Sequence, residues 1–229
     1  MKPNYGIDAP PVIRNLLVVG IPATLVGLVF PTLGVTIWAP GVCFILTAGL
    51  MVLYAKVGKF GHRERMLDLV PWRGDENVLD VGTGRGLLLI GAAKRLDQGK
   101  SYGIDIWNSQ DLSNNSAEHT QRNVELEGVK DRTEILNESA TKLSFENGFF
   151  DLIFSNLCLH NLPSIEDRAI ACREIARVLK KQGTAIISDF QKLTEYETVF
   201  RSEGCEVSKE GPFFLSTFPP LSILRVTKV

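Results

Sequence analysis

A glycine-rich turn follows a short apolar run in the first half of the chain. The run 78–81 (VLDV) leads into the turn 82–86 (GTGRG), whose GxGxG spacing differs from the GxGxxG of dinucleotide-binding folds. Glycines permit positive φ angles and let a ligand approach the backbone closely. Asp80 stands two residues before the first glycine, where a carboxylate repels a pyrophosphate and attracts an ammonium group. The motif therefore predicts a ligand that carries positive charge.

A second carboxylate, Asp105, stands at the end of the next β-rich run, 101–106. A carboxylate at the end of this strand can accept hydrogen bonds from both hydroxyls of a ribose. Nicotinamide sites and adenosylmethionine sites share this feature. Asp105 therefore predicts a nucleoside ligand without choosing between the two.

Short β-rich runs alternate with amphipathic stretches of helical length beyond residue 60. The predicted strands are 77–81, 101–106, 133–137, 151–155 and 184–190, and the predicted helices are 62–70, 86–96, 116–127 and 165–180. This alternation favours an α/β fold, in which helices cover both faces of a mostly parallel sheet. Two further strand-like runs, 205–210 and 222–227, have no helix between them, which predicts an antiparallel hairpin at one sheet edge.

The chain from about residue 60 to its C-terminus resembles the class I S-adenosylmethionine-dependent methyltransferases, because VLDVGTGRG is similar to their first motif. The resemblance implies a Rossmann-like fold, S-adenosylmethionine as cofactor and methyl transfer as activity. It also implies that Asp80 helps to place the cofactor's amino group and that Asp105 holds its ribose. The other cofactor-binding residues expected around these two are Gly82, Thr83, Gly84, Gly86 and Ile106.

Two later segments are similar to further parts of the same family. Segment 138–145 resembles the stretch that flanks the adenine, and the resemblance implies cofactor contacts from Ser139 and Ala140, with Ser139 standing where the family usually has Asp. Segment 150–162 resembles the fourth strand and the following turn, which implies that Asn156 and Leu157 lie near the transferred methyl group. Asn156 is thus also a candidate catalytic residue.

His160 is the second catalytic candidate, and two interpretations of it stay open. Its side chain suits the removal of a proton from a methyl acceptor. Alternatively, it only hydrogen-bonds a nearby carbonyl group.

The N-terminal part of the chain is almost entirely apolar. From residue 15 to residue 55 there is no Asp, Glu, Lys, Arg or His, and this length suits two membrane passes of about 20 residues each. We expect helices at about 16–37 and 42–57, with the reversal at residues 38–41 (WAPG) or, alternatively, near 31–34. The predicted division is therefore a membrane hairpin over residues 1–58 and a methyltransferase domain over residues 59–229.

Basic residues flank the apolar segment on both sides, at Lys2, Arg14, Lys56 and Lys59. The positive-inside rule then places both ends, and the catalytic domain, in the cytoplasm. Three alternatives to a spanning hairpin are insertion into one leaflet, burial in a soluble protein and a cleaved signal peptide. The signal peptide is disfavoured by the second apolar run.

The overall composition limits the partners. A net charge of −1 gives no reason to expect nucleic acid, and the four widely spaced cysteines suggest no metal site. A membrane-bound methyltransferase is expected to act on an apolar or membrane-resident acceptor: a phospholipid head group, a prenylated quinone precursor or a lipophilic thiol. Two other functions are a membrane scaffold that binds a nucleotide without catalysis and a membrane-bound nicotinamide reductase.

The loop 211–221 between the last two predicted strands has an unusual composition. It carries three phenylalanines and three prolines and no charged residue. Either its rings cover the edge of the sheet, or they wall an apolar pocket or dip into the bilayer.

Overall fold

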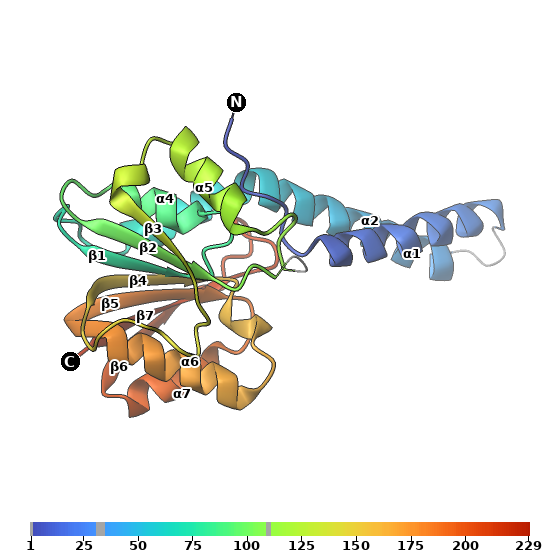
Figure 1. Ribbon diagram of the computed structural model, residues 1–229. Coiled ribbons are helices and arrows are strands. Elements are labelled where there is room, and N and C mark those ends of the chain that lie inside the picture. The colour runs from blue at the N-terminus through green and yellow to red at the C-terminus, as the bar shows by residue number, and fades with distance from the viewer. Residues whose placement is uncertain (1, 31–34, 109–110) are drawn as a thin grey trace.

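The computed structural model describes residues 2–30, 35–108 and 111–229. An α/β domain carries a long helical hairpin that projects from one side (Figure 1). The strands are β1 (Asn77–Val81), β2 (Lys100–Asp105), β3 (Thr133–Asn137), β4 (Phe150–Asn156), β5 (Leu179–Asp189), β6 (Cys205–Glu210) and β7 (Ser222–Lys228). The helices are α1 (Pro10–Val29), α2 (Val35–Leu53), η1 (Tyr54–Gly58), α3 (Lys59–Asp68), α4 (Leu87–Ala93), α5 (Ala117–Leu126), η2 (Lys130–Arg132), η3 (Leu159–Asn161), α6 (Ile165–Val178) and α7 (Leu193–Ser202).

The strands form one seven-stranded sheet in the order β3-β2-β1-β4-β5-β7-β6. The strands β1 to β5 run parallel, and β7 is antiparallel to both of its neighbours, β5 and β6. The strand order reverses between β1 and β4. The connection that leaves β1 and the connection that leaves β4 therefore run in opposite directions across the sheet. This topology confirms the predicted Rossmann-like methyltransferase fold, including the antiparallel hairpin at the C-terminus.

Helices cover both faces of the sheet, with α4 and α5 on one side and α6 and α7 on the other (Figure 1). Successive strand residues point to opposite faces. Val78 and Phe154 accordingly belong to the cluster formed with α3 and α4, while Leu79 and Ile153 belong to the cluster with α6 and α7. All four side chains are fully buried.

The helix α7 is an element that the sequence analysis did not predict. Its buried residues are Leu193, Tyr196 and Phe200, spaced by three and four positions as on one face of a helix. The signal was therefore present in the sequence, within a polar stretch that follows the long strand β5.

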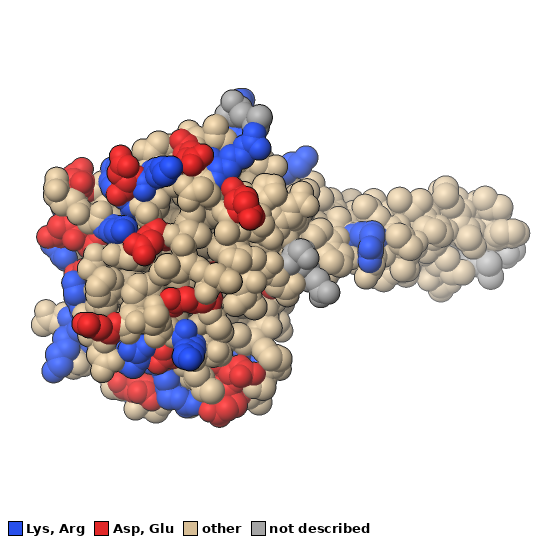
Figure 2. Space-filling view, in the orientation of Figure 1, with Lys and Arg blue, Asp and Glu red and all other residues tan. Residues whose placement is uncertain are grey.

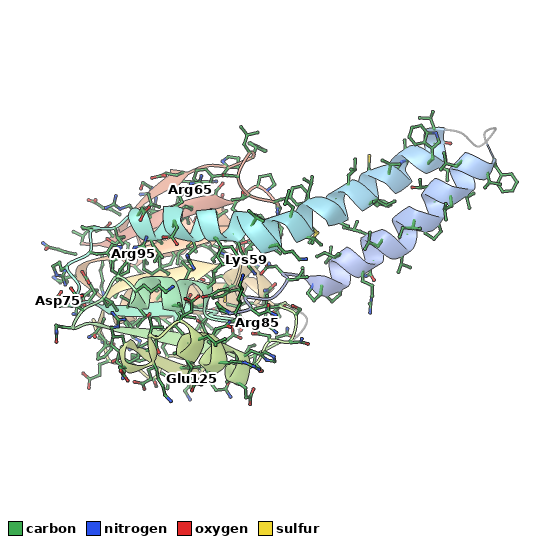
Figure 3. The ribbon with its side chains drawn as sticks, turned by 90° about the horizontal axis from the view of Figure 1, so that it is seen from above. Lys59, Arg65, Asp75, Arg85, Arg95 and Glu125 are labelled. Carbon is green, nitrogen blue, oxygen red and sulfur yellow. The ribbon has the colours of Figure 1, made fainter. Side chains whose placement is uncertain are left out.

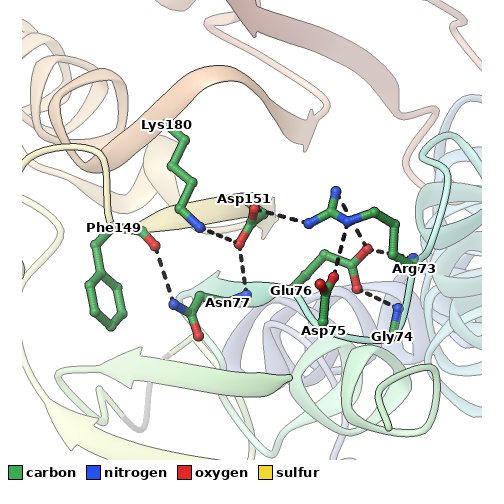
Figure 4. Close-up of polar contacts among 8 residues, drawn as sticks. All are labelled: Arg73, Gly74, Asp75, Glu76, Asn77, Phe149, Asp151 and Lys180. Carbon is green, nitrogen blue, oxygen red and sulfur yellow. Dashed lines mark hydrogen bonds and ion pairs between the residues drawn. The ribbon is translucent and has the colours of Figure 1, made fainter. Parts of the chain in front are cut away.

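A polar network closes the edge of the sheet at which β1 and β4 begin (Figure 4). The Asp151 carboxylate accepts hydrogen bonds from Lys180 Nζ at 2.8 Å, from the backbone N–H of Asn77 at 2.9 Å and from Arg73 Nη2 at 3.2 Å. The fully buried Glu76 accepts from the backbone N–H groups of Arg73 and Gly74. The amino ends of these strands are therefore closed by hydrogen bonds among side chains and backbone groups of the protein. The carboxyl ends of the strands are open.

The reversal of the N-terminal hairpin lies elsewhere than at residues 38–41. The helix α1 ends at Val29 and α2 begins at Val35, so Trp38 and Gly41 lie inside α2, and the prediction of a turn there is wrong. The alternative position, 31–34, lies outside the described residues. A Cβ atom at Gly41 would lie 2.5 Å from Thr24 Oγ1, and one at Gly27 would lie 2.6 Å from Trp38 Cβ. These glycines permit close packing of the two helices and do not mark a turn.

The outer surface of the hairpin is apolar and exposed. Figure 2 shows it nearly free of charged side chains, in contrast to the domain. Large exposed hydrophobic residues occur along both helices, among them Val18, Leu28, Leu46 and Leu50. By length and composition alone, the segments Pro10–Val29 and Val35–Asp68 are both long and apolar enough to cross a membrane.

No linker separates the hairpin from the domain. The short π-helix η1 joins α2 directly to α3, so the helix runs from Val35 to Asp68. In addition, residues 4–9 lie against the domain, because Lys59 Nζ donates hydrogen bonds to the carbonyls of Tyr5 and Gly6. The predicted division between residues 58 and 59 falls within this continuous helix.

Substitution of Gly41 tests the packing of the hairpin. We expect Gly41→Ala to destabilise the protein in detergent by about 1–3 kcal/mol, because the new methyl group overlaps the backbone of α1. The control is Gly49→Ala in the same helix, where a Cβ meets nothing within 4 Å. Thermal unfolding of both variants should separate them, and equal melting temperatures would contradict this account of the glycine.

Candidate cofactor site

A pocket opens at the carboxyl ends of β1, β2 and β4, beside the point where the strand order reverses. Ligands of open α/β sheets bind at this place. Eight of the residues predicted to bind the cofactor line it, namely Gly82, Gly84, Asp105, Ile106, Ser139, Ala140, Asn156 and Leu157. The pocket lining does not include Asp80, Thr83, Gly86 or His160.

The glycine turn is built tightly against the end of β2. Gly82 and Gly84 have φ angles of 75° and 52°, in the left-handed region that favours glycine. A Cβ at Gly82 would collide with Cys158, and one at Gly84 would lie 2.9 Å from Leu112. The backbone N–H of Gly82 donates to the Ile104 carbonyl at 2.9 Å. The turn thus presents bare backbone to the pocket.

Asp80 does not line the pocket. Its Oδ2 accepts hydrogen bonds from Thr83 Oγ1 and from the backbone N–H of Leu89, both at 2.8 Å. The Thr83 hydroxyl is therefore also hydrogen-bonded within the protein. Burial raises the pKa of Asp80 to about 7, although these two hydrogen bonds oppose the shift. These two hydrogen bonds join the glycine turn to the start of α4.

Gly86 likewise lies behind the pocket. It is the residue before the first turn of α4, with a φ angle of 83°, and its role is to let the chain enter the helix.

Asp105 reaches the rim of the pocket from the end of β2. Its Oδ2 accepts the backbone N–H of Gly84 at 2.7 Å, and its Oδ1 accepts that of Trp107 at 2.6 Å. A weaker bond from Asn115 Nδ2 measures 3.4 Å. A carboxylate has about four lone-pair sites, so Asp105 keeps capacity for a further hydroxyl donor.

Two amide oxygens in the pocket have no hydrogen-bond partner among the residues that the structure describes. Asn156 Oδ1 and Asn115 Oδ1 are buried and lack a hydrogen bond, although buried polar atoms are nearly always bonded. Both residues line the pocket. They are suited to receive N–H or O–H groups of a bound nucleoside or amino acid, so the residues present fit S-adenosylmethionine.

The pocket is also strongly acidic. Four of its lining residues are carboxylates, Asp8, Asp105, Asp111 and Glu138, and none of the described lining residues is Lys, Arg or His. Burial, and then the charge of Asp105, raise the pKa of Asp111. Carboxylates crowded in this way favour a cationic ligand, as the glycine motif predicted.

His160 belongs to a polar cluster beside the pocket. Its Nδ1 lies 2.9 Å from Oδ1 of Asp189, the last residue of β5. The Asp189 carboxylate is almost fully buried and also accepts from the backbone N–H of Phe190 at 2.8 Å and from Tyr196 Oη at 3.4 Å. His160 is thus bonded to a carboxylate group.

Several lining residues were missed by the sequence analysis. They are Asp8, Ile104, Asn108, Asp111, Leu112, Asn115, Glu138, Cys158, Asn161 and Leu162. Most lie in the loops after β2 and β4, where position after a strand end was a usable signal. Asp8 carried no such signal, because it is distant in sequence from the other residues of the pocket.

Comparison with known proteins identifies the domain around this pocket. Residues 79–187 match the family described as methyltransferase domain. This part of the chain is a methyltransferase domain. The match begins in β1 and ends in β5, so it includes the glycine turn, Asp105 and Asn156, and the cofactor of the domain is S-adenosylmethionine. The predicted family and cofactor are confirmed.

Curated relatives share this domain but differ in the rest of their chains. The protein is 31% identical over 125 residues to a sterol 4-C-methyltransferase of Caenorhabditis elegans, which covers 53% of this chain and 34% of the relative. It is 31% identical over 121 residues to a ubiquinone/menaquinone biosynthesis C-methyltransferase of Vibrio campbellii, covering 52% and 43%. The chain thus spans less than half the length of these relatives.

Solved structures agree on the fold. A methyltransferase from Aquifex aeolicus has a TM-score of 0.58 at 21% identity and covers 73% of this chain and 89% of its own. A geranyl diphosphate methyltransferase in complex with S-adenosylmethionine has a TM-score of 0.59 at 15% identity, covering 73% and 83%.

The buried Asp80 predicts a pH effect on stability. A carboxyl whose pKa is raised by folding, here from 3.8 to about 7, stabilises the fold below about pH 4 and loses that contribution as the pH rises through about 7. Asp80→Asn keeps an acceptor for Thr83 and Leu89 but cannot ionise. We therefore expect its melting temperature to fall less than that of the wild type between about pH 4 and 7.

Asp131→Asn, at an exposed position, serves as the control and should follow the wild-type pH profile. Parallel profiles for the wild type and Asp80→Asn would refute the shifted ionisation.

Proposed function

We propose that the protein is a membrane-anchored methyltransferase that moves a methyl group from S-adenosylmethionine to an apolar or membrane-resident acceptor, with its catalytic domain facing the cytoplasm. One observation carries this proposal. The cofactor pocket lies at the base of the apolar hairpin, since Asp8 lines the pocket and α1 begins at Pro10. An acceptor that resides in the membrane would therefore lie next to the transferred methyl group.

The lengths of the two helices support a spanning hairpin. At 1.5 Å per residue, the 20 residues of α1 and the 19 of α2 each extend about 30 Å, close to the thickness of a bilayer core. Lys2 precedes α1, and Lys56 and Arg65 follow α2, which favours the cytoplasm for the domain. Insertion into one leaflet remains the second arrangement, and it leaves the pocket equally close to lipid.

Methyl transfer needs little from the protein beyond positioning. The cofactor supplies an electrophilic methyl group on a sulfonium. The glycine turn, Asp105 and Asn156 would hold the cofactor, and the acidic lining would balance the positive charge of its sulfonium. Holding the acceptor in line with the methyl group contributes much of the rate enhancement.

His160 is the candidate for proton removal. With Nδ1–H donated to Asp189, Nε2 is the basic atom of the ring. Asp189 then acts as a positioning residue that fixes the tautomer. The ring is further oriented by Phe190, whose centroid lies 4.8 Å away in an edge-on arrangement. Such a pair supports acceptors with an ionisable N–H, O–H or S–H group.

The loop 211–221 divides into an inner and an outer part at the base of the hairpin. Phe213 packs against the core, with the Arg65 guanidinium 4.4 Å from its ring centroid, and Arg65 Nη1 donates to Ser216 Oγ at 3.0 Å. Phe214 and Leu215 instead point outward and are 70% and 103% exposed. This pair supports contact with lipid at the level of the head groups.

The names of the relatives support a lipophilic acceptor. Sterol and quinone methyltransferases are among the curated relatives, and a geranyl diphosphate methyltransferase is among the structural neighbours. We therefore favour a prenylated ring or the amino group of a phospholipid as acceptor, with a lipophilic thiol as the next choice.

Activity on membrane lipids tests the function and the role of His160 together. The purified full chain in nanodiscs, given methyl-labelled S-adenosylmethionine and total membrane lipid, should place label in the lipid phase. His160→Gln should lower kcat about 100-fold while the cofactor Kd stays constant. The control is His119→Gln, because His119 is exposed on α5. Label appearing only in water-soluble products would refute the membrane acceptor.

The outer part of the loop gives a separate prediction. Phe214→Ser combined with Leu215→Ser should raise the apparent KM for a lipid acceptor several-fold without changing cofactor affinity, because the loop loses its lipid contact. Val229→Ser, also at a 70% exposed side chain but at the C-terminus, should leave KM unchanged. Normal KM in the folded double variant would restrict the loop to covering the sheet.

A further inference from the structure

The segment of residues 4–9, here termed the strap, is held against the domain by side chains from the helices α3 and α5. Lys59 Nζ at the start of α3 donates to the carbonyls of Tyr5 and Gly6 at 2.7 and 2.8 Å. Asn123 on α5 both accepts from and donates to the backbone of Asn4, each at 2.9 Å. Figure 3 shows Lys59 and Arg85 at the junction of the hairpin and the domain.

The strap also pairs with the loop that follows β2. The backbone N–H of Ser113 donates to the Ile7 carbonyl at 3.0 Å, and that of Ala9 donates to the Asp111 carbonyl at 2.9 Å. Asp8 lies between these bonds and forms a β-bridge with Leu112. The position of Asp8 is therefore fixed by backbone hydrogen bonds on both sides.

This pairing places Asp8 at the glycine-turn end of the pocket. Leu112, its bridge partner, lies 2.9 Å from the site of a Cβ on Gly84, and Asp8, Leu112 and Gly84 all line the pocket. The glycine turn is the part of the site at which the sequence motif predicts a positively charged ligand group.

The Asp8 carboxylate lacks a full set of partners. Its Oδ2 is buried and has no hydrogen bond to any described residue. The nearest cation is Lys59 Nζ at 3.6 Å, too far for a hydrogen bond and already engaged with two carbonyls of the strap. Burial raises the pKa of Asp8, and the charge of Lys59 opposes this shift. A buried carboxylate oxygen in this state is suited to a positively charged donor.

We propose that the Asp8 carboxylate receives the ammonium group of the cofactor's amino acid, the role that the sequence assigned to Asp80. The inference rests on the proposed use of S-adenosylmethionine. Among the pocket carboxylates, Asp105 accepts hydrogen bonds from the backbone of Gly84 and Trp107 and stands at the position expected for the ribose. Asp8 instead lies at the glycine turn with one carboxylate oxygen that accepts no hydrogen bond from the described residues. Because the strap continues directly into α1 at Pro10, the membrane hairpin and the ammonium subsite are one stretch of chain.

Two ligands separate ammonium recognition from nucleoside recognition. S-adenosylhomocysteine carries the amino acid, and 5′-methylthioadenosine is the same nucleoside thioether without it. For the full chain in detergent, isothermal calorimetry should show that Asp8→Asn weakens S-adenosylhomocysteine at least about tenfold, the loss expected for a charged hydrogen bond. The affinity for 5′-methylthioadenosine should be the same in wild type and variant.

A matched control loosens the strap outside the pocket. Tyr5→Phe removes the hydrogen bond from Tyr5 Oη to Glu127, which measures 2.8 Å, and should change the two affinities by the same factor. If Asp8→Asn also weakens both ligands equally, or weakens neither, the proposal is overturned. Failure of the wild type to bind either ligand would instead reject the cofactor assignment itself, and the ammonium subsite with it.

Loss of Asp8 leaves Lys59 without a carboxylate partner, which can destabilise the strap. If Asp8→Asn does not fold, the double variant Asp8→Asn with Lys59→Met removes both charges, and the same two titrations decide the outcome. Selective loss of S-adenosylhomocysteine again supports the proposal, and an equal loss or no loss overturns it.

Discussion

The reversal of strand order between β1 and β4 is the constraint on which the rest of the molecule depends. The chain leaves β1 toward α4 on one face and leaves β4 toward α6 on the other, so no connection covers the gap between the two strand ends. The glycine turn, Asp105 and Asn156 gather at this gap because each follows the end of a strand. The opposite edge carries no such opening, since Asp151 and its partners close it.

The N-terminal hairpin is joined to the pocket side of the domain by buried polar contacts. Its two helices pack closely against each other. Glycines let α1 and α2 approach until backbone meets backbone, which leaves their apolar side chains facing outward. At the base, Lys59 binds the strap through carbonyl groups and stands near Asp8. The apolar stalk and the acidic pocket are thus neighbours in space, although the residues that form them are far apart in sequence.

Local patterns were sufficient to predict the sheet and eight of the residues that line the pocket. Apolar runs bounded by turns gave every strand, although β5 begins at Leu179 and not at 184 as predicted. Strand ends followed by glycine or carboxylate gave Gly82, Gly84 and Asp105 in the pocket lining. Orientation was beyond such patterns, because Asp80 and its neighbours face α4 by packing that no spacing encodes. Long-range contacts were equally hidden: Asp189 meets His160, and Asp8 meets the pocket, only in three dimensions. Gly41 led to a wrong prediction of a turn, because glycine also permits close contact between two helices.

The unbroken helix from Val35 to Asp68 has a further consequence for a protein held in a bilayer. A flexible tether would let the domain sample many heights above the lipid, whereas a continuous helix holds the pocket at one height. Acceptors are then selected by depth: the reacting atom must protrude from the membrane to the level of the β4 end. Two lipids with the same reactive group but different spacers to their tails would differ as substrates for this reason alone. Substrate choice in such an enzyme would depend partly on the height of the reactive atom above the membrane. The helix would set this height independently of the shape of the pocket.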